Sequence, residues 1–282
     1  MKLRDLRNIF EQELRLIYEV DEVRQHFALL CEAYYAYSPA EVVLHLQTPV
    51  LVSDSIRFKK DLAQLKKNVP IQYIIGKVAF ANVQLNVNGS VLIPRPETEE
   101  LVHWILATIP NKEPIHVLDI GTGSGCIAIA IKKARPNWNI SAWDIDVDAL
   151  QVAEQNAKKN NVEIDFHCID VLSKNLPQRK WDMIISNPPY VPAGLKKKTQ
   201  PCVLAHEPQY AIFVPDKAPL CFFEHICDYA VKQLRCTGNL FFEGHAPLME
   251  SIEILLQQAG FSDIVLRNDF RTNPRFIRAT KR

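Results

Sequence analysis

Apolar side chains in the first part of the chain recur at a helical spacing. Near the start they follow a period close to 3.6, at Leu3, Leu6, Ile9, Phe10, Leu14 and Ile17. Further amphipathic stretches span residues 23–37, 40–46 and 53–67, and Pro39 after Ser38 suits the start of a helix. The pattern predicts a small bundle of three or four short helices over residues 1 to about 68.

A short alternating pattern follows the bundle. Apolar residues alternate from Val83 to Val87, then Asn88-Gly89 precedes the apolar run 91–93. Because Asn and Gly tolerate positive φ, this pattern predicts a β-hairpin that turns at Asn88-Gly89. The prolines at 94 and 96 end the hairpin, and a helix is expected from Glu97 to about Thr108.

From Ile115 onward the pattern alternates between strands and helices. The candidate strands are Ile115–Ile120, Asn139–Asp144, Glu163–Cys168, Trp181–Ser186, Gly238–Glu243, Phe261–Arg267 and Arg275–Thr280. The candidate helices are Ser124–Arg135, Asp148–Asn160, Pro219–Arg235 and about Pro247–Ala259. Strands that alternate with helices form a mostly parallel sheet covered on both faces. The last two strands are too close in the chain for a helical crossover, so they should pair antiparallel.

These patterns divide the chain into three expected parts. They are a helical N-terminal domain over residues 1–75, a β-hairpin linker over 76–96, and an α/β domain over 97–282. The predicted fold class is therefore α/β. A Rossmann-like, mostly parallel sheet that ends in an antiparallel hairpin is the arrangement typical of class I methyltransferase domains.

Composition and charge are those of an ordinary globular protein. Of the 282 residues, 48% are hydrophobic and 23% charged, and the formal net charge is +1. A near-neutral chain has no general attraction for nucleic acid. The one compact basic run, Lys196-Lys197-Lys198, is more typical of a solvated loop.

The cysteines and the N-terminus indicate the compartment. The seven cysteines are odd in number and lack CxxC spacing, which argues against a disulfide framework and a structural zinc site. The N-terminus lacks the features of a signal peptide, and no apolar stretch approaches the ~18 residues of a membrane span. We therefore expect no metal, no membrane association and a cytoplasmic location.

A glycine-rich turn follows the first strand of the α/β domain. It reads Asp119-Ile120-Gly121-Thr122-Gly123-Ser124-Gly125. Glycines at such a turn let the backbone approach a ligand closely. A dinucleotide fingerprint would need glycine at position 126, where the chain has Cys126. The Asp119 carboxylate would oppose a pyrophosphate but suits an ammonium group, so the loop predicts S-adenosylmethionine as the cofactor.

Acidic residues also end the next two strands. Asp144 can hold ribose hydroxyls, as in analogous nucleotide sites. Asp170 can accept from the adenine amino group while Val171 packs on the ring, and Asp146 is a candidate helix cap.

The fourth strand opens into Asn187-Pro188-Pro189-Tyr190 at the carboxyl edge of the sheet, where α/β folds bind ligands. An amide or aromatic amine is a poor nucleophile because its lone pair is delocalised. The Asn187 side-chain oxygen and the Pro188 carbonyl can each accept one N–H of such a group. Tyr190 offers an aromatic face to it. The motif therefore predicts methyl transfer to a planar nitrogen, with Asn187, Pro188 and Tyr190 as catalytic residues.

No strong general base is needed for this reaction, because the methylated nitrogen becomes acidic. Positioning and two aimed acceptors should supply most of the rate. The sequence contains neither an obvious catalytic triad nor HExxH, and the eight scattered histidines are expected to be structural.

At these residues the chain resembles the HemK-type peptide chain release factor glutamine N5-methyltransferases. The resemblance covers nearly the whole chain. It is carried by residues 70–76, Phe80, Leu92 to Glu99 (Leu-Ile-Pro-Arg-Pro-Glu-Thr-Glu), Asp119 to Gly125, Asn187 to Tyr190, and Glu207-Pro208. Asn-Pro-Pro-Tyr alone is shared with nucleic-acid base methyltransferases, whereas Ile-Pro-Arg-Pro-Glu-Thr-Glu is far more specific.

The resemblance implies an acceptor, the glutamine of the Gly-Gly-Gln loop in class 1 release factors, and translation termination as the process. It implies that the cofactor is lined by Gly121 to Gly125, Asp144, Val171 and Asn187. It implies that Asn187, Pro188, Pro189 and Tyr190 hold the glutamine amide, and that Phe80 and Arg95 close over the site. Phe80 fits an ordinary core position equally well. We expect release factors as the protein partner, no direct nucleic-acid partner and a monomer.

Some positions depart from the family pattern. Val69 stands where an acidic residue is common, residues 214–218 lack the usual glycines, and residues 244–247 lack the usual glutamine. These changes bear on the mobility of the loop after the motif and on its contacts, and they leave the cofactor loop and the acceptor motif intact.

Two other functions remain open on the sequence. A DNA or RNA base amino-methyltransferase can use the same motif once the base is flipped out, although it needs a basic groove. A cofactor-binding regulator or docking scaffold could also share the fold, although the intact motif beside an intact glycine loop argues against lost catalysis.

Overall fold

The computed structural model describes residues 1–110 and 114–282, which separate into two compact units. The first unit contains residues 1–76 together with 200–206, and the second contains residues 77–199 and 207–282. Each unit has its own apolar core. The segment 200–206 was not expected in the first unit, because nothing in its local pattern distinguishes it from the residues around it.

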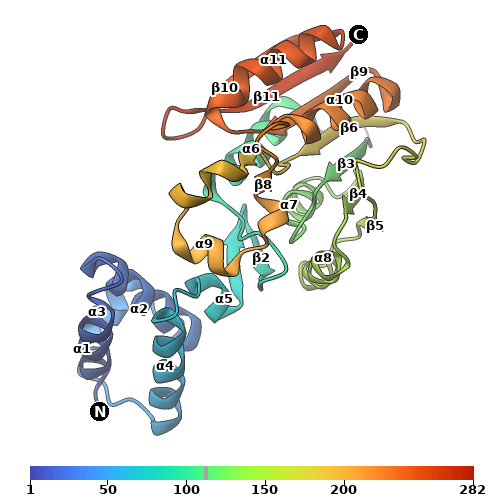
Figure 1. The fold of residues 1–282 in the computed structure, drawn as a ribbon. Helices are drawn as coiled ribbons and strands as arrows, with labels where there is room; N and C mark the ends of the chain where they lie inside the picture. Colours follow the sequence, from blue (N-terminus) through green and yellow to red (C-terminus); the bar gives the residue numbers. More distant parts are fainter. Residues whose placement is uncertain (111–113) are drawn as a thin grey trace. The chain divides into compact units, whose positions relative to one another are not determined.

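The first unit is helical, as the apolar period predicts. Its helices are α1 (Leu3–Leu14), α2 (Val20–Tyr35), α3 (Pro39–Leu44), α4 (Val52–Leu65), α5 (Ile71–Ile75) and α9 (Pro201–His206) (Figure 1). Phe10, Phe27 and Phe58 form the centre of the core, with the rings of Phe10 and Phe27 5.3 Å apart. Ser38 caps α3 by accepting from the backbone N–H of Glu41. 

The hairpin lies earlier in the chain than predicted. It pairs β1 (Lys77–Phe80) with β2 (Val83–Asn86) and turns at Ala81-Asn82, both at positive φ. The prediction of a turn at Asn88-Gly89, with a strand at residues 91–93, is therefore wrong.

The free edge of β2 explains the error. Asn156 lies in α8 (Val147–Lys159), and Asn160 caps the C-terminal end of that helix. The side-chain amides of both residues form hydrogen bonds with the backbone of β2. The Asn156 amide, for example, lies 2.6 Å from the Asn86 nitrogen and 3.0 Å from its carbonyl oxygen. These amides take the place of a third strand.

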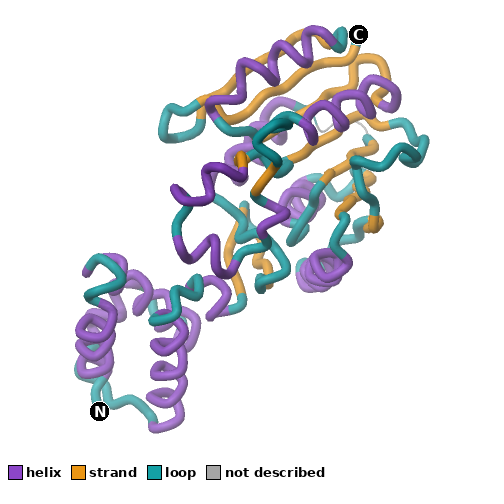
Figure 2. The backbone as a smooth tube through the Cα atoms, viewed as in Figure 1, coloured by secondary structure: helices purple, strands orange, loops and turns teal. Residues whose placement is uncertain are grey.

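The second unit is built on a sheet of seven strands in the order β10-β11-β9-β6-β3-β4-β5. Figure 2 draws the strands in orange and the helices in purple. The strands are β3 (His116–Ile120), β4 (Asn139–Asp144), β5 (Asp165–Cys168), β6 (Trp181–Ser186), β9 (Leu234–Glu243), β10 (Phe261–Asn268) and β11 (Pro274–Lys281). β3 lies parallel to β4 and β6, and β11 lies antiparallel to β9 and β10. The predicted mostly parallel sheet with its antiparallel C-terminal hairpin is confirmed.

Alternation along the strands gives the sheet two buried faces. Val117, Met183 and Phe241 point to one face, where they pack with α6 (Pro96–Thr108) and α7 (Cys126–Ala134). Their neighbours Leu118 and Ile184 point to the other, toward α10 (Cys221–Gln233) and α11 (Met249–Gln258). A strand buried on both faces reads as a continuous apolar run, which is why these strands were recognised in the sequence.

Shorter elements connect β6 to α10. They are β7 (Val191–Pro192), which pairs in parallel with β8 (Phe213–Val214), and the 3₁₀ segments Ala193–Lys198 and Gln209–Ala211. A third 3₁₀ turn, Ala246–Leu248, precedes α11. Across the described part of the chain, no helix combines the length and apolarity needed to cross a membrane.

Candidate active site

A cavity of about 310 Å³ lies at the carboxyl ends of β3, β4 and β6. It falls where the strand order reverses, since β4 lies on one side of β3 and β6 on the other. Ligands bind at such switch points in open α/β sheets. The predicted site residues that line it are Gly121, Gly123, Asp144, Asp170, Val171, Asn187, Pro188 and Pro189.

The glycine loop turns sharply between β3 and α7. Gly121, Gly123 and Gly125 have φ of 72°, 53° and 80°, which a side chain would strain. A Cβ on Gly125 would lie 2.9 Å from the Ile129 side chain and 3.2 Å from Ala153. A Cβ on Gly121 would meet nothing within 4 Å. Gly125 therefore allows close helix packing, whereas Gly121 leaves open space beside the cavity.

Asp119 lies beneath this loop and does not line the cavity. Its Oδ2 accepts from the Thr122 hydroxyl at 2.7 Å. Its Oδ1 has no hydrogen bond to any residue that the structure describes. Burial raises the pKa of Asp119 to about 7, although the Thr122 hydroxyl and the nearby Ala128 backbone oppose the rise. An acceptor left without a partner in the interior fits the expected role of binding an ammonium group, directly or through water.

Thr122, Ser124 and Gly125 also lie outside the cavity wall. Thr122 and Ser124 are buried, and the Ser124 carbonyl accepts from the Asn156 amide at 2.9 Å. These three residues shape the loop rather than line the cavity.

Asp144 ends β4 and faces the cavity. Its carboxylate accepts from the backbone N–H groups of Gly123 at 2.7 Å and Asp146 at 3.0 Å. A carboxylate has about four acceptor positions, so two remain for a pair of hydroxyls. Burial raises the pKa of Asp144, and the two N–H groups counteract it. Asp146 caps α8, as predicted.

Another part of the cavity wall is apolar and includes one carboxylate. Val171 belongs to the core cluster of the α10 face and also lines the cavity. Ile145, Ile169 and Phe222 complete this wall. The Asp170 Oδ1 accepts from the Leu172 backbone at 2.9 Å, which leaves Oδ2 to accept from an amino group. A flat apolar ring with an exocyclic amine fits this part of the wall.

Asn187 lines the same cavity, directly after β6. Its side-chain nitrogen donates to the Thr98 hydroxyl at 3.2 Å, so its oxygen is the atom left for a substrate N–H. Pro188 and Pro189 line the cavity beside it. The motif and the glycine loop thus face one cavity.

Tyr190 does not line this cavity. Its hydroxyl lies 3.5 Å from the Glu243 carboxylate and 3.3 Å from the Arg275 guanidinium. Its ring stacks on His245 at 6.1 Å. Burial raises the pKa of Tyr190. The expected contact of its ring with a planar substrate is therefore not seen within the cavity wall, and its hydroxyl is engaged elsewhere.

The two linker residues expected to close over the site behave differently. Phe80 is fully buried in the core with α6 and α7 and is absent from the cavity wall, which fits the core alternative. Its role at the site stays a prediction. Arg95 also lies outside the wall, but it forms a 2.6 Å ion pair with buried Glu207. Glu207 Oε2 also accepts from the Ile93 backbone at 3.2 Å. Arg95 and Glu207 thus hold the Ile-Pro-Arg-Pro segment against the chain after the motif.

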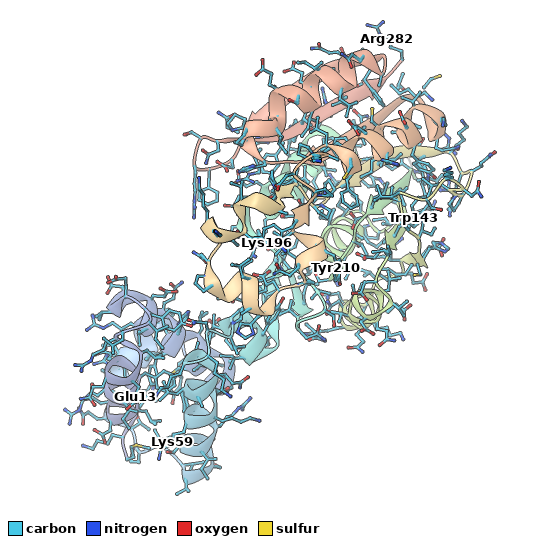
Figure 3. The ribbon with its side chains drawn as sticks, viewed as in Figure 1. Glu13, Lys59, Trp143, Lys196, Tyr210 and Arg282 are labelled. Carbon is cyan, nitrogen blue, oxygen red and sulfur yellow. The ribbon has the colours of Figure 1, made fainter. Side chains whose placement is uncertain are left out.

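Three residues near the site were not predicted from the sequence. Thr98 and Glu243 are buried behind Asn187 and hydrogen-bonded to each other. Tyr210, labelled in Figure 3, lines the cavity, and its hydroxyl donates to the Asp146 carboxylate and approaches the Ser90 carbonyl at 3.3 Å. Thr98 lies within the motif Ile93 to Glu99, the one sequence signal that pointed toward it.

The cavity wall, together with the Asp119 carboxyl beneath the glycine loop, fits S-adenosylmethionine by its chemistry. The unpartnered Asp119 oxygen suits the ammonium group, the Asp144 carboxylate suits the ribose hydroxyls, and the apolar part beside Asp170 suits adenine. The cofactor would supply an electrophilic methyl group in the cavity that Asn187 also lines.

This fold and this site define a class I methyltransferase that uses S-adenosylmethionine. Two solved structures share the fold. A methyltransferase from Pyrococcus furiosus has a TM-score of 0.52 at 17% identity, covering 82% of this chain and 99% of the other. The hMettl16 catalytic domain has a TM-score of 0.55 at 18% identity, covering 69% and 74%.

The chain belongs to the release factor glutamine methyltransferase family. The relative of that name from Flavobacterium psychrophilum is 37% identical over 288 residues, covering 100% of both chains. The one from Bacteroides thetaiotaomicron is 33% identical over 271 residues, covering 96% of this chain and 97% of the other. Residues 5–76 match the PrmC N-terminal domain, and residues 102–204 match the methyltransferase small domain.

Proposed function

We propose that this chain methylates the side-chain amide nitrogen (N5) of the glutamine in the Gly-Gly-Gln loop of class 1 release factors. The observation that carries the proposal is the Asn187 amide. Its nitrogen is bound to Thr98 and its oxygen is left for the cavity. A primary amide presents two N–H donors in one plane, and Asn187 with the Pro188 carbonyl supplies two acceptors for them.

The residues of this chain act by orientation. Asn187 Oδ1 and the Pro188 carbonyl accept the two N–H groups, which fixes the plane of the glutamine amide and turns its nitrogen toward the sulfonium. When bound, S-adenosylmethionine supplies an electrophilic methyl group attached to a positively charged sulfur. As the nitrogen–carbon bond forms, the electron pair of the carbon–sulfur bond remains on sulfur.

Positive charge develops on the amide nitrogen during the transfer. The same two acceptors face the N–H groups that carry this charge, so their hydrogen bonds strengthen toward the transition state. The nitrogen then loses one proton to solvent. Because solvent takes this proton, the reaction requires no side-chain base.

A transfer assay with labelled S-adenosylmethionine tests the proposal. It compares a class 1 release factor, the same factor with the Gly-Gly-Gln glutamine replaced by asparagine, and bulk DNA and RNA. Label on the intact factor alone supports the proposal. Label on nucleic acid and none on the factor would instead support a base amino-methyltransferase.

We also propose that the enzyme is a monomer and that its first unit binds the release factor. Support comes from the match of residues 5–76 to a domain named for this family. Large apolar side chains are also exposed in the stretch 43–56, at Val43, Leu44, Leu51, Val52 and Ile56. Apolar exposure of this kind is typical of a protein-binding surface when it is clustered.

A further inference from the structure

Two buried polar side chains, Thr98 and Glu243, continue a chain of hydrogen bonds from Asn187 of the acceptor motif. The Asn187 Nδ2 lies 3.2 Å from the Thr98 Oγ1. The Thr98 Oγ1 lies 2.8 Å from the Glu243 Oε2. Thr98 and Glu243 are both 2% exposed, and neither lines the cavity. Thr98 therefore contacts Asn187 from outside the cavity wall, and Glu243 contacts Thr98.

The Thr98 hydroxyl has a single proton, so it can donate in only one of these two hydrogen bonds. A hydroxyl has one proton and accepts through its lone pairs. Burial raises the pKa of Glu243 to about 7, so above that pH the side chain is a carboxylate that can only accept. The Thr98 hydroxyl then donates its proton to Glu243 Oε2. Toward Asn187 it then acts only as an acceptor, and the side-chain nitrogen of Asn187 must face it.

The orientation of the Asn187 amide follows from this direction. With the nitrogen facing Thr98, the oxygen faces the cavity as an acceptor. If the amide rotated by half a turn, two oxygens would oppose each other at Thr98, and an NH₂ group would face the NH₂ of the substrate. Both contacts would be unfavourable in a site with little water.

Further contacts hold the Glu243 carboxylate in place. On the other side of Glu243, the Tyr190 hydroxyl lies 3.5 Å from Oε1, and Arg275 contacts that hydroxyl at 3.3 Å. Arg275 in turn bonds Asp269 at 3.4 Å. Since these contacts come from the motif and from β11, the carboxylate is fixed from more than one element.

We propose that Thr98 and Glu243 are positioning residues, which hold the Asn187 amide with its oxygen toward the acceptor nitrogen. The inference rests on the proposed amide-methylating function. It assigns to a threonine in the Ile-Pro-Arg-Pro-Glu-Thr-Glu motif the task of selecting one of the two amide orientations. Orientation is thereby set before the substrate arrives, which is the form of preorganisation that lowers a barrier.

Three variants of the full chain test the proposal: Thr98→Val, Thr98→Ser and Glu243→Gln. Valine keeps the shape of threonine and removes the hydroxyl. We expect the kcat of Thr98→Val for release factor methylation to fall at least tenfold, while the Kd for S-adenosylmethionine changes less than twofold. Thr98→Ser restores the hydroxyl and should recover kcat to within threefold of the wild type.

Glu243→Gln provides an independent measurement if Thr98→Val does not fold. Glutamine keeps the size of the side chain but is a weaker acceptor and can also donate. We expect its kcat to fall at least threefold with cofactor affinity retained. Thr280→Val is the matched control, because Thr280 lies on β11 opposite Asn239, far along the strands from the Glu243 pairing. It should keep kcat within twofold.

Two results would overturn the inference. One is a Thr98→Val enzyme that folds and keeps its kcat within twofold. The other is a Thr98→Ser enzyme as impaired as Thr98→Val, which would mean that the methyl group and not the hydroxyl matters. Failure of the proposed function is distinct from both, since the wild-type enzyme itself would then transfer no label to the release factor.

Discussion

At the scale of single residues, burial of the Asp119 carboxyl has an energetic cost that the rest of the structure must offset. Its pKa is raised to about 7, mainly by burial. A raised carboxyl pKa means that the folded state favours the neutral form, so its stabilising contribution is complete below pH ~4 and is lost as the pH rises through about 7. Near and above pH 7 the protein therefore holds a buried charge that the expected ammonium group would match.

Replacing Asp119 with asparagine separates stability from binding. Between pH 5.5 and 8 we expect the wild type to lose about 2 kcal/mol more unfolding free energy than Asp119→Asn, because the variant has no carboxyl to ionise. Cofactor affinity should fall about threefold or more. Urea unfolding at the two pH values and equilibrium binding of S-adenosylmethionine measure these effects. Equal pH dependence in both proteins would contradict the argument.

Asn187→Ala should separate binding from catalysis. One of two amide acceptors is lost, and the loss of a comparable transition-state contact costs about 2.7–4 kcal/mol, or a 10²–10³-fold lower kcat. The Kd for S-adenosylmethionine should stay within a few fold. Single-turnover methylation of a release factor, together with cofactor binding, checks the prediction. Substantial residual turnover would mean that Asn187 does not hold the amide.

The sequence indicated those site residues that belong to contiguous motifs. Gly121 and Asn187 were recognised because each follows a buried strand, and Asp144 because it ends one. Thr98 and Glu243 could not be related to Asn187 in this way, since they lie 145 positions from each other and Thr98 lies 89 from Asn187. Such contacts follow from the tertiary fold and have no local signal.

At the scale of elements, the glycine loop shows how one turn serves both packing and binding. Gly121 and Gly125 have similar positive φ, but only Gly125 faces close neighbours. Alanine at either position should cost about 1 kcal/mol in strain. The Ile129 and Ala153 contacts add an overpacking cost of about 1–3 kcal/mol to Gly125→Ala alone.

The two glycine variants should therefore have different main defects, one in thermal stability and the other in cofactor binding. Gly125→Ala should show the larger drop in thermal stability. Gly121→Ala should remain more stable but bind S-adenosylmethionine at least tenfold more weakly, because its new methyl group enters the space beside the cavity. Thermal unfolding and equilibrium binding of both variants decide the matter. The reverse ranking in both measurements would refute this division of roles.

Elements were predictable where their contacts are regular. The buried strands β4 and β6 were predicted with their observed bounds, because a parallel strand buried on both faces is mostly apolar. The hairpin was misplaced because β2 is completed by asparagine side chains of α8. The short helix α9 and the pair β7–β8 were missed because short elements depend on tertiary contacts.

At the scale of the whole molecule, the exposed apolar residues 43–56 bear on substrate docking. The double variant Leu51→Ser with Val52→Ser should raise the KM for the release factor about fivefold, because apolar contact area is lost. Its kcat and its Kd for S-adenosylmethionine should not change. Leu51 and Val52 are 69% and 78% exposed, so folding should be unaffected.

A matched control comes from the second unit. Val265→Ser with Leu266→Ser changes another adjacent pair of exposed apolar residues, on β10. Steady-state kinetics of both double variants should show the higher KM only for the first pair. Equal kinetics for the two would remove the docking role from residues 51 and 52.

The membership of residues 200–206 in the first unit has a consequence for engineering. The chain passes from one unit to the other three times, after residues 76, 199 and 206, and the His206 ring bonds the Lys67 carbonyl at 3.0 Å. A chimera that exchanged only the first 76 residues would leave a foreign α9 against the new bundle. Shuffling this N-terminal module between relatives thus requires a second graft, at a site well inside the catalytic sequence.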